Sequence, residues 1–216
     1  MSSINHIGLI PDGNRRWALK NSLDYKTAYM KSMVHIVNCI GWIFDMNFES
    51  ISIYLLSNEN LKREREDIDS VIYAEEYLLS DILYPVCQQY SCKVIHAGNR
   101  DLLPYSMKIK IDYLCSITRD YKERTLFLLI GYNPIDEINT TINQNGFIEM
   151  SLLSVPKKVD VVIRTAGGAS LLSNFLPIQC GYAQIYMVDA LFNDLTRQEI
   201  EAILNTASQV KMQYGK

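Results

Sequence analysis

The chain alternates short apolar segments with longer segments of helical periodicity, and this alternation restricts its fold more than any other feature. Residues 125–130 form a near-continuous apolar run, as expected of a strand buried on both faces of a parallel sheet. Strands are predicted at His6–Ile10, Ser50–Leu56, Lys93–Ala97, Thr125–Tyr132, Val159–Arg164 and Gln184–Val188. Helices are predicted at Lys26–Phe44, Asp67–Tyr90, Tyr105–Tyr121, Ile135–Ile142 and Thr196–Gln213. The pattern favours the α/β class, with residues 1–216 as a single domain built on an open, mostly parallel β-sheet with flanking helices.

Composition excludes several classes of protein. The 216 residues are 48% hydrophobic, which is enough for a substantial core. The 21 basic and 24 acidic residues nearly balance, which argues against binding nucleic acid by charge. No apolar run is long enough for a transmembrane segment and no leader peptide opens the sequence, so a cytoplasmic location is expected. Neither a disulfide framework nor a zinc site is indicated by the five scattered cysteines: Cys39, Cys87, Cys92, Cys115 and Cys180.

The first predicted strand runs directly into Asp12, Gly13 and Asn14, followed by two arginines. A carboxylate at a strand end suits Mg²⁺, which takes oxygen ligands and usually shares them with substrate phosphates. Backbone amides and arginine side chains are the groups that bind a diphosphate. The simpler interpretation is a capped turn with Asp12 as N-cap and solvated arginines.

Polar residues follow three different predicted strands. Asp12, Ser57–Asn60 and Arg164 all lie at carboxyl ends, where open parallel sheets bind ligands. The predicted helix Asp67–Tyr90 carries an apolar stripe that fits a core face and the wall of an apolar tunnel equally well. The stripe comprises Ile68, Val71, Ile72, Leu78, Leu79 and Ile82.

Three sequence blocks, in order, resemble the signatures of the cis-prenyltransferases, the undecaprenyl diphosphate synthase superfamily. They are His6–Trp17, then Ile53–Arg63, then Val161–Thr165 with Ser173–Leu176 and Tyr182–Tyr186. The resemblance spans nearly the whole chain. It implies the undecaprenyl diphosphate synthase-like fold, Mg²⁺ as cofactor, a homodimer, and isoprenyl diphosphates such as dimethylallyl, geranyl or farnesyl diphosphate as substrates.

The resemblance also implies roles for individual residues. Asp12 is expected to hold Mg²⁺, and Asn60 to act near the reacting carbons. The expected allylic diphosphate site consists of Gly13, Asn14, Arg15, Arg16 and Arg63. The expected tunnel residues are Trp17, Tyr29, Leu55 and Leu61, and the expected second diphosphate site retains Arg164, Ser173 and Gln184.

Some departures from the chain-elongating pattern indicate a subgroup. Pro11, Arg15, Ala28-Tyr29 and Phe175-Leu176-Pro177 resemble the lavandulyl-type and cyclolavandulyl-type synthases. Those relatives join two short allylic diphosphates head-to-middle. Leu55, followed by Leu56, stands where the family's tunnel needs a small side chain, which predicts a short product.

Other departures fall on the second diphosphate site. Leu171 and Gln213 replace arginines there, and Gln184 replaces a glutamate that helps bind Mg²⁺. Charge-assisted bonds to phosphate contribute about 1.5–3 kcal/mol each. We therefore expect a second substrate that binds loosely, one that has no diphosphate, or no second substrate at all. Compensation could come from Lys157, Lys158 or the inserted segment 166–170.

Four functions stay open at this point. The first is irregular, lavandulyl-type coupling of short allylic units, and the second is terpene-synthase-like ionisation and cyclisation of one allylic diphosphate. The third is ordinary short-chain cis condensation with isopentenyl diphosphate. The fourth is a non-catalytic partner subunit, against which the intact Asp12-Gly13-Asn14 and Arg16 argue.

Overall fold

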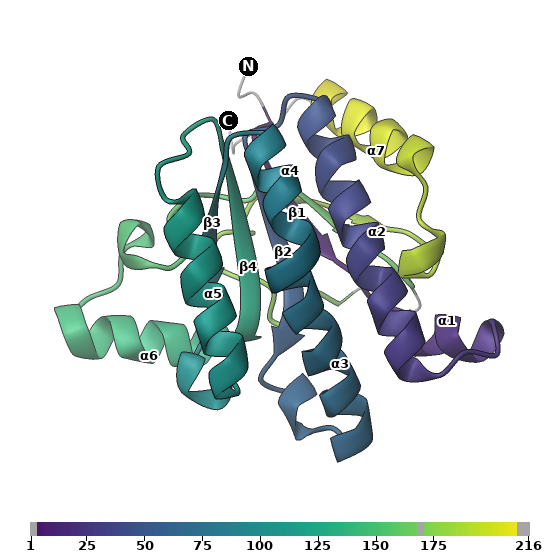
Figure 1. Cartoon of the computed structure of the whole chain (residues 1–216). Helices are drawn as coiled ribbons and strands as arrows, with labels where there is room; N and C mark the ends of the chain where they lie inside the picture. The colour runs from purple at the N-terminus through teal and green to yellow at the C-terminus, as the bar shows by residue number, and fades with distance from the viewer. Residues whose placement is uncertain (1–3, 168–170, 211–216) are drawn as a thin grey trace.

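A computed structural model describes residues 4–167 and 171–210. Its centre is a six-stranded sheet in the order β3-β4-β2-β1-β5-β6, in which all neighbouring strands are parallel (Figure 1). The strands are β1 His6–Ile10, β2 Ser50–Ser57, β3 Cys92–Ala97, β4 Arg124–Tyr132, β5 Val161–Arg164 and β6 Gln184–Met187. Each predicted strand is confirmed to within two residues, and so is the open parallel α/β architecture.

The helices are α1 Asn14–Lys20, α2 Tyr25–Asp45, α3 Arg65–Tyr77, α4 Leu83–Gln89, α5 Tyr105–Thr118, α6 Pro134–Asn145 and α7 Arg197–Gln209. Figure 1 shows α2, α3, α4 and α5 side by side in front of the sheet. Strand side chains alternate between two apolar clusters because successive residues point to opposite faces. Leu126 and Leu128 pack towards these helices, whereas Phe127 and Leu129 pack with Phe175 and Leu176 on the other face.

The predicted helix Asp67–Tyr90 is not one regular helix. Regular α-helix stops at Tyr77, a π-helical turn covers Leu78–Ile82, and α4 begins at Leu83. Pro85 explains the interruption, because proline lacks an N–H donor and its ring clashes with the carbonyl four residues earlier. The wider π turn accommodates that carbonyl and keeps both segments packed against the sheet.

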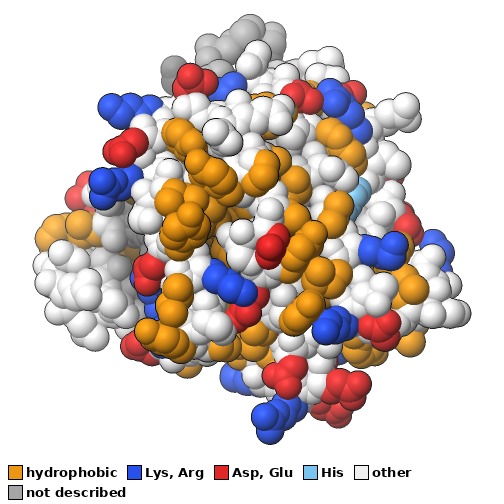
Figure 2. Space-filling view, in the orientation of Figure 1, with side chains coloured by type: hydrophobic (Ala, Val, Ile, Leu, Met, Phe, Trp, Pro, Cys, Tyr) orange, Lys and Arg blue, Asp and Glu red, His pale blue; other side chains and the backbone are white. Residues whose placement is uncertain are grey.

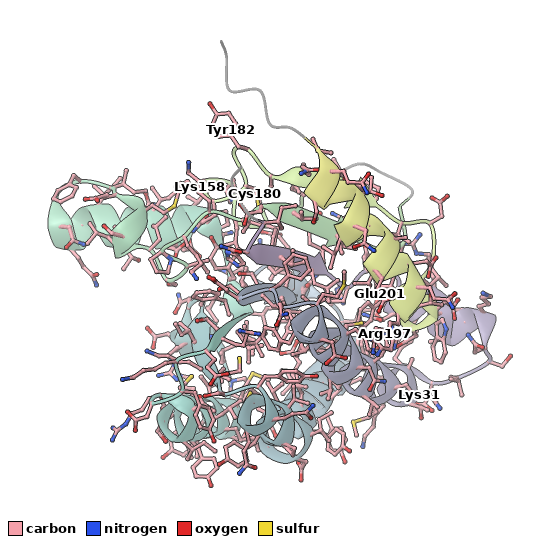
Figure 3. The ribbon with its side chains drawn as sticks, turned by 90° about the horizontal axis from the view of Figure 1, so that it is seen from above. Lys31, Lys158, Cys180, Tyr182, Arg197 and Glu201 are labelled. Atoms are coloured by element: carbon pink, nitrogen blue, oxygen red, sulfur yellow. The ribbon has the colours of Figure 1, made fainter. Side chains whose placement is uncertain are left out.

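Helix α1, Asn14–Lys20, was not among the predicted helices. The other differences are at element ends. Helix α6 is longer than the predicted Ile135–Ile142, and only a single 3₁₀ turn, Met150–Leu152, follows in the segment 144–154. Helix α7 begins with a capping box between Thr196 and Glu199. Its predicted end at Gln213 lies outside the described residues. Arg197 of α7 reaches Asp45 of α2 at 3.1 Å, which ties the two helices together (Figure 3).

Apolar side chains also reach the surface of the helical layer. Figure 2 shows them in stripes along the helices, and they include Tyr105, Ile109 and Tyr113 of α5 at a spacing of four residues. Among residues 4–167 and 171–210, no helix combines the length and apolar character needed to cross a membrane.

Candidate active site

The adjacent strands β2, β1 and β5 end beside one cavity of about 330 Å³. Strand β1 lies between β2 and β5, and Ile10 at its end is paired with Arg164 at the end of β5. This register brings together residues that are about 150 positions apart in the chain. Asp12 follows β1, Ser57 ends β2 and Arg164 ends β5, so the convergence expected from the sequence is confirmed. The cavity is lined by Ile10, Pro11, Asp12, Gly13, Asn14, Arg15, Arg16, Tyr29, Met33, Ile36, Tyr54, Leu55, Leu56, Ser57, Asn60, Arg63, Val71, Glu75, Arg164 and Ser173.

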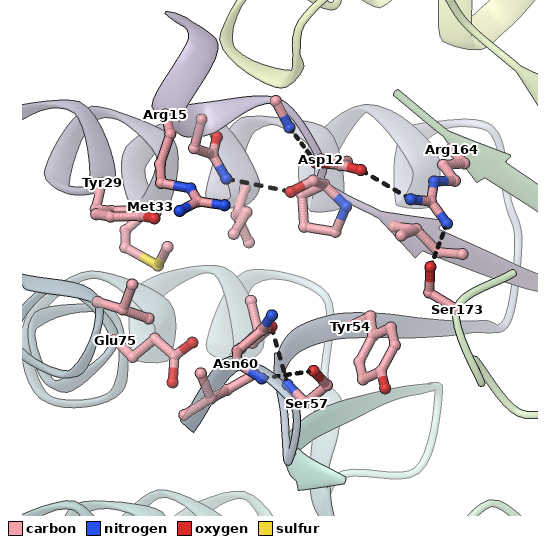
Figure 4. A pocket seen from close by; sticks show the side chains of 18 of the residues that line it. Asp12, Arg15, Tyr29, Met33, Tyr54, Ser57, Asn60, Glu75, Arg164 and Ser173 are labelled. Carbon is pink, nitrogen blue, oxygen red and sulfur yellow. Dashed lines mark hydrogen bonds and ion pairs between the residues drawn. The ribbon is translucent and has the colours of Figure 1, made fainter. Parts of the chain in front are cut away.

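The position of Asp12 is fixed by both its backbone and its carboxylate. The Thr165 hydroxyl accepts a hydrogen bond from the Asp12 N–H at 2.9 Å and donates one to the Asp12 carbonyl at 2.8 Å. The carboxylate accepts from the Gly13 N–H at 2.6 Å and from the Arg164 guanidinium at 2.8 Å (Figure 4). The side chain stays 40% exposed, so a fixed carboxylate faces the mouth of the cavity.

Asn14 anchors the turn to its surroundings. Its amide nitrogen donates to the Pro11 carbonyl at 3.1 Å, and its oxygen accepts from the Ser32 hydroxyl of α2 at 2.9 Å. Asn193 donates to the same hydroxyl at 2.9 Å. Both ends of the Asn14 amide are thus engaged by the protein, which makes Asn14 a positioning residue for Asp12 and the arginines.

Two of the arginines are held by a buried carboxylate, Asp67, which the sequence analysis did not single out. Asp67 accepts a hydrogen bond from the Tyr29 hydroxyl at 2.9 Å and lies 3.4 Å from Arg15 and 3.6 Å from Arg63. Burial and the nearby Asp67 charge raise the pKa of Tyr29, so Tyr29 stays a neutral donor. The clue in the sequence was the spacing of Arg63 and Asp67, four residues apart at the start of α3.

The other two arginines lie on the opposite side of Asp12. Arg16 donates to the Ala166 carbonyl at 3.2 Å and stands 3.8 Å from the Asp12 carboxylate. Arg164 donates to the Ser173 hydroxyl at 2.8 Å as well as to Asp12. With Arg15 and Arg63, four guanidinium groups surround the cavity. Guanidinium groups bind phosphate oxygens in bidentate geometry, so this mouth suits a diphosphate.

Asn60 also lines the cavity, directly after β2. Its side-chain oxygen accepts from the Ser57 N–H at 3.2 Å, and its own N–H donates to the Ser57 hydroxyl at 3.1 Å. This pair of bonds closes the turn and presents both residues to the cavity (Figure 4).

Of the four expected tunnel residues, Tyr29 and Leu55 line the cavity and two do not. The Trp17 indole donates to the Asp194 carboxylate at 2.7 Å, which directs it away and packs α1 against the turn at 192–194. Leu61 packs against the main apolar core instead. Neither is brought to the site.

Arg164 and Ser173 of the expected second site lie in the same cavity as the expected allylic residues, but Gln184 does not. The Gln184 amide donates to the Ala207 carbonyl of α7 at 3.0 Å, and its oxygen accepts from Tyr186 at 3.0 Å. Gln184 therefore links β6 to α7. Leu171 is exposed and offers only its carbonyl oxygen, to Arg164. Gln213 and residues 168–170 lie outside the described residues.

The two lysines that could have replaced the lost charge of the second diphosphate site lie at the far end of the sheet. Lys157 donates to the hydroxyl of Ser50, the first residue of β2, at 2.8 Å. Lys158 has its carbonyl bonded to His6 at the start of β1, and its ammonium stands 6.0 Å from the ring centroid of Tyr182 (Figure 3). Neither ammonium can reach Arg164 or Ser173 at the carboxyl ends of the strands.

The residues present fit a Mg²⁺ ion shared with a substrate. No group of three or more His, Cys, Asp or Glu side chains suited to a metal occurs within 4–167 and 171–210. Asp12 supplies one carboxylate at the cavity mouth, and Mg²⁺ in proteins commonly has one or two carboxylates with substrate phosphates and water completing its shell. Asp12 is thus the residue that would hold the ion.

The comparisons with known proteins agree with this geometry. The family model described as "Putative undecaprenyl diphosphate synthase" matches residues 10–215. The chain belongs to the undecaprenyl diphosphate synthase family of cis-prenyltransferases.

Its relatives in this family include a tritrans,polycis-undecaprenyl-diphosphate synthase (geranylgeranyl-diphosphate specific) of Pyrobaculum aerophilum, 29% identical over 98% of this chain and 95% of that one. An isoprenyl transferase of Campylobacter jejuni is 26% identical over the full length of both. The crystal structure of a probable undecaprenyl diphosphate synthase from Campylobacter jejuni covers both chains completely, with 25% identity and a TM-score of 0.81. Lavandulyl diphosphate synthase from Lavandula x intermedia, in complex with dimethylallyl diphosphate, shares the fold with a TM-score of 0.88, 21% identity and 98% coverage of each chain.

In this prenyltransferase, Gly13 must be glycine for two separable reasons. Its φ is 100°, and a Cβ there would meet the Ala166 Cβ at 2.8 Å and the Leu191 Cδ2 at 2.9 Å. We expect Gly13→Ala to displace Asp12 and to reduce activity as well as stability. Gly146→Ala is the matched control, because Gly146 has a φ of 80° but open space around its Cβ position. A cost of about 1–2 kcal/mol for positive φ applies to both variants. Chemical unfolding measures the loss of stability in both variants. If Gly13→Ala lost no more stability than Gly146→Ala, the close approach of Ala166 and Leu191 to Gly13 would be contradicted.

Proposed function

We propose that the chain is a Mg²⁺-dependent prenyltransferase that ionises a short allylic diphosphate and transfers the prenyl group to a second short isoprenoid unit, in irregular, lavandulyl-type coupling. The observation that carries this proposal is the cavity itself. Its mouth holds Asp12 and four arginines, and its inner walls are formed by apolar side chains such as Met33, Ile36 and Val71. A charged head and a short apolar tail are what an allylic diphosphate offers to such a site.

The residues at the mouth act on the leaving group. Arg15, Arg16 and Arg63 would donate to diphosphate oxygens as the C–O bond breaks and its electron pair leaves with diphosphate. Asp12 would hold Mg²⁺, which when bound neutralises charge on those oxygens. The Asp67 carboxylate keeps Arg15 and Arg63 oriented before the substrate arrives, so their reorganisation cost at the moment of reaction is low.

A short substrate is favoured by the size of the cavity. A volume of about 330 Å³ lies near the lower end of ligand cavities, which span roughly 300–1,000 Å³. The relative from Pyrobaculum aerophilum is named as an undecaprenyl-diphosphate synthase, so ordinary cis condensation with isopentenyl diphosphate is the main alternative. The lavandulyl-like motifs and the bound dimethylallyl diphosphate of the lavandula enzyme make dimethylallyl diphosphate the first substrate to test.

A second candidate, terpene-synthase-like turnover of one allylic diphosphate, is favoured by a specific observation. Gln184 is committed to α7, Leu171 offers no charge, and Lys157 is at the other end of the sheet. Arg164 and Ser173 alone would have to bind a second diphosphate, and Arg164 is already bonded to Asp12. A single domain over residues 1–216, a homodimer and a cytoplasmic location belong to the same proposal and rest on family membership.

The decisive experiment is product identification. Purified protein with Mg²⁺ would receive dimethylallyl, geranyl or farnesyl diphosphate, each with and without isopentenyl diphosphate. Branched products from dimethylallyl diphosphate alone support irregular coupling, and hydrocarbons or alcohols from one unit support the terpene-synthase-like reaction. Head-to-tail products that need isopentenyl diphosphate would make ordinary condensation the function. No turnover of any substrate would favour a non-catalytic subunit.

We expect Leu55 to limit the length of the prenyl chain, because it lines the cavity where the chain would extend. Leu55→Ala should admit geranyl diphosphate better than the wild type does, by at least roughly the 10–200-fold that one methylene group is worth in a hydrophobic pocket. Leu61→Ala is the control, since Leu61 packs against the core and does not line the cavity. Competition between dimethylallyl and geranyl diphosphate measures the shift, and an equal shift in both variants would contradict the role of Leu55.

A further inference from the structure

One carboxyl group in the wall of this cavity is not used by the mechanism above. Glu75 of α3 is fully buried, and neither of its carboxyl oxygens has a hydrogen-bond partner among the described residues. Burying a charged or polar group without a partner is costly, so such groups are rarely retained without a function. The next residue shows the usual arrangement, since Glu76 binds Lys110 at 2.9 Å and also accepts from Ser106.

Glu75 faces the inner, apolar part of the cavity. Figure 4 shows its carboxyl group turned into the cavity below Met33, well away from Arg164 and Ser173 at the other end. Met33 and Ile36 of α2 and Val71 of α3 line the same part. A substrate with its diphosphate among the arginines would extend its prenyl carbons towards this group.

The surroundings leave Glu75 with an unusual charge state. Burial alone raises its pKa to about 8. The other charged or titratable groups of these walls are engaged elsewhere: Arg15, Arg63 and Tyr29 bind Asp67, and Tyr54 keeps its proton because burial raises its pKa to about 12. A carboxyl group that titrates near the working pH can both accept and release a proton efficiently.

We propose that Glu75 is the catalytic base of this site, which takes up the proton that the prenyl cation must lose. The inference rests on the proposed function. After the C–O bond has broken and diphosphate has left with the electron pair, the C=C bond of the second isoprenoid unit attacks the allylic cation, which forms the new C–C bond and leaves a cation on the coupled product. A C–H bond next to that cationic carbon then breaks. Its electron pair forms the new C=C bond and its proton passes to a Glu75 carboxylate oxygen. Product release returns that proton to water, so the cycle needs no further reactant.

The location explains why a base is needed on the apolar side. The cation carbons lie away from the diphosphate. At this end of the cavity Tyr29 holds its proton, and the amide of Asn60, which lies beside Glu75 in Figure 4, is not a base. A carboxylate there also attracts the cation while it exists, because its charge is little screened in a dry cavity.

Glu75→Gln tests this assignment, since it keeps the shape of the side chain and removes the base. Glu66→Gln on the exposed side of α3 is the control. Binding of dimethylallyl thiolodiphosphate, which ionises slowly, would be measured by calorimetry, and turnover of dimethylallyl diphosphate by product analysis. We expect Glu75→Gln to bind the analogue like the wild type and to lose about 100-fold or more in kcat. Alcohols from water capture should replace alkene products, the rise of kcat with pH near 8 should disappear, and Glu75→Asp should restore part of the rate.

The outcomes separate this inference from the proposed function. A wild type that neither binds nor converts any allylic diphosphate would overturn the proposed function and this inference with it. If the wild type is active and Glu75→Gln is equally active, with the same products and pH profile, only the assignment of Glu75 as the base is overturned. Equal losses of affinity and turnover in Glu75→Gln would also overturn it, because they would make Glu75 a binding group.

Discussion

Replacing Asp12 with asparagine is expected to lower turnover of an allylic diphosphate by about 1,000-fold and to leave the fold intact. The backbone of Asp12 is held by Thr165 at 2.8–2.9 Å, and these bonds do not depend on the carboxylate. An amide oxygen can still accept from the Gly13 N–H, so the turn should persist. The charge that would hold Mg²⁺ and balance Arg164 is lost, and a neutral oxygen is a weaker ligand for a hard cation.

The effect should appear in kcat and in the Mg²⁺ requirement, and circular dichroism should show an unchanged fold. Asp120→Asn is the matched control, because Asp120 has a side chain that is 89% exposed after α5 and far in sequence from any residue of the cavity. A folded Asp12→Asn protein with more than a tenth of the wild-type rate would contradict the role assigned to this carboxylate.

The sheet could be predicted well from the sequence because its inner strands, such as β1 and β4, are buried on both faces. Such strands are nearly continuous apolar runs that end at polar residues, as β4 does at Tyr132 and Asn133. Parallel pairing then brings the carboxyl ends together, which predicted that Asp12, Asn60 and Arg164 would meet. Local sequence alone carried this information.

What failed to be predicted depends on contacts between distant segments. Trp17 belongs to the first family motif. Asp194, which lies 177 positions later in the chain, nevertheless directs the Trp17 indole away from the cavity. Gln184 appeared to be a weakened metal ligand, but α7 engages it through the Ala207 carbonyl. The π turn before Pro85 depends on how α3 and α4 must pack, and helical periodicity does not reveal it.

Glu75 was hidden by the same limitation. A glutamate followed by another glutamate on a helix is ordinary in sequence, and only the packing around α3 shows that Glu75 is fully buried while Glu76 reaches Lys110 of α5. Its neighbours in space, Met33 and Ile36, are about 40 residues away in the chain.

Stability should reveal the cost of this burial as a dependence on pH. The pKa of Glu75 is about 8 in the folded protein and 4.5 is its ordinary value, so the folded state binds the extra proton between these values. Below about pH 4.5 the burial of Glu75 therefore does not lower the free energy of unfolding of the wild type. As the pH rises from there to about 8, the wild type loses stability. The slope approaches about 1.4 kcal/mol per pH unit, and the loss amounts to several kcal/mol in total.

Urea unfolding of the wild type and of Glu75→Gln between pH 5 and pH 8 measures this loss. The difference between the unfolding free energies of the two proteins isolates the contribution of Glu75, because His6 contributes equally to both. Burial lowers the pKa of His6 to about 4 from 6.5, so its contribution rises with pH in the lower part of the range, in the opposite direction. Glu75→Gln should be the more stable protein at pH 8 by several kcal/mol and should approach the wild type near pH 5. A pH-independent difference would show that the Glu75 carboxyl ionises in the folded protein as readily as in water, and that the cavity wall around it is wet.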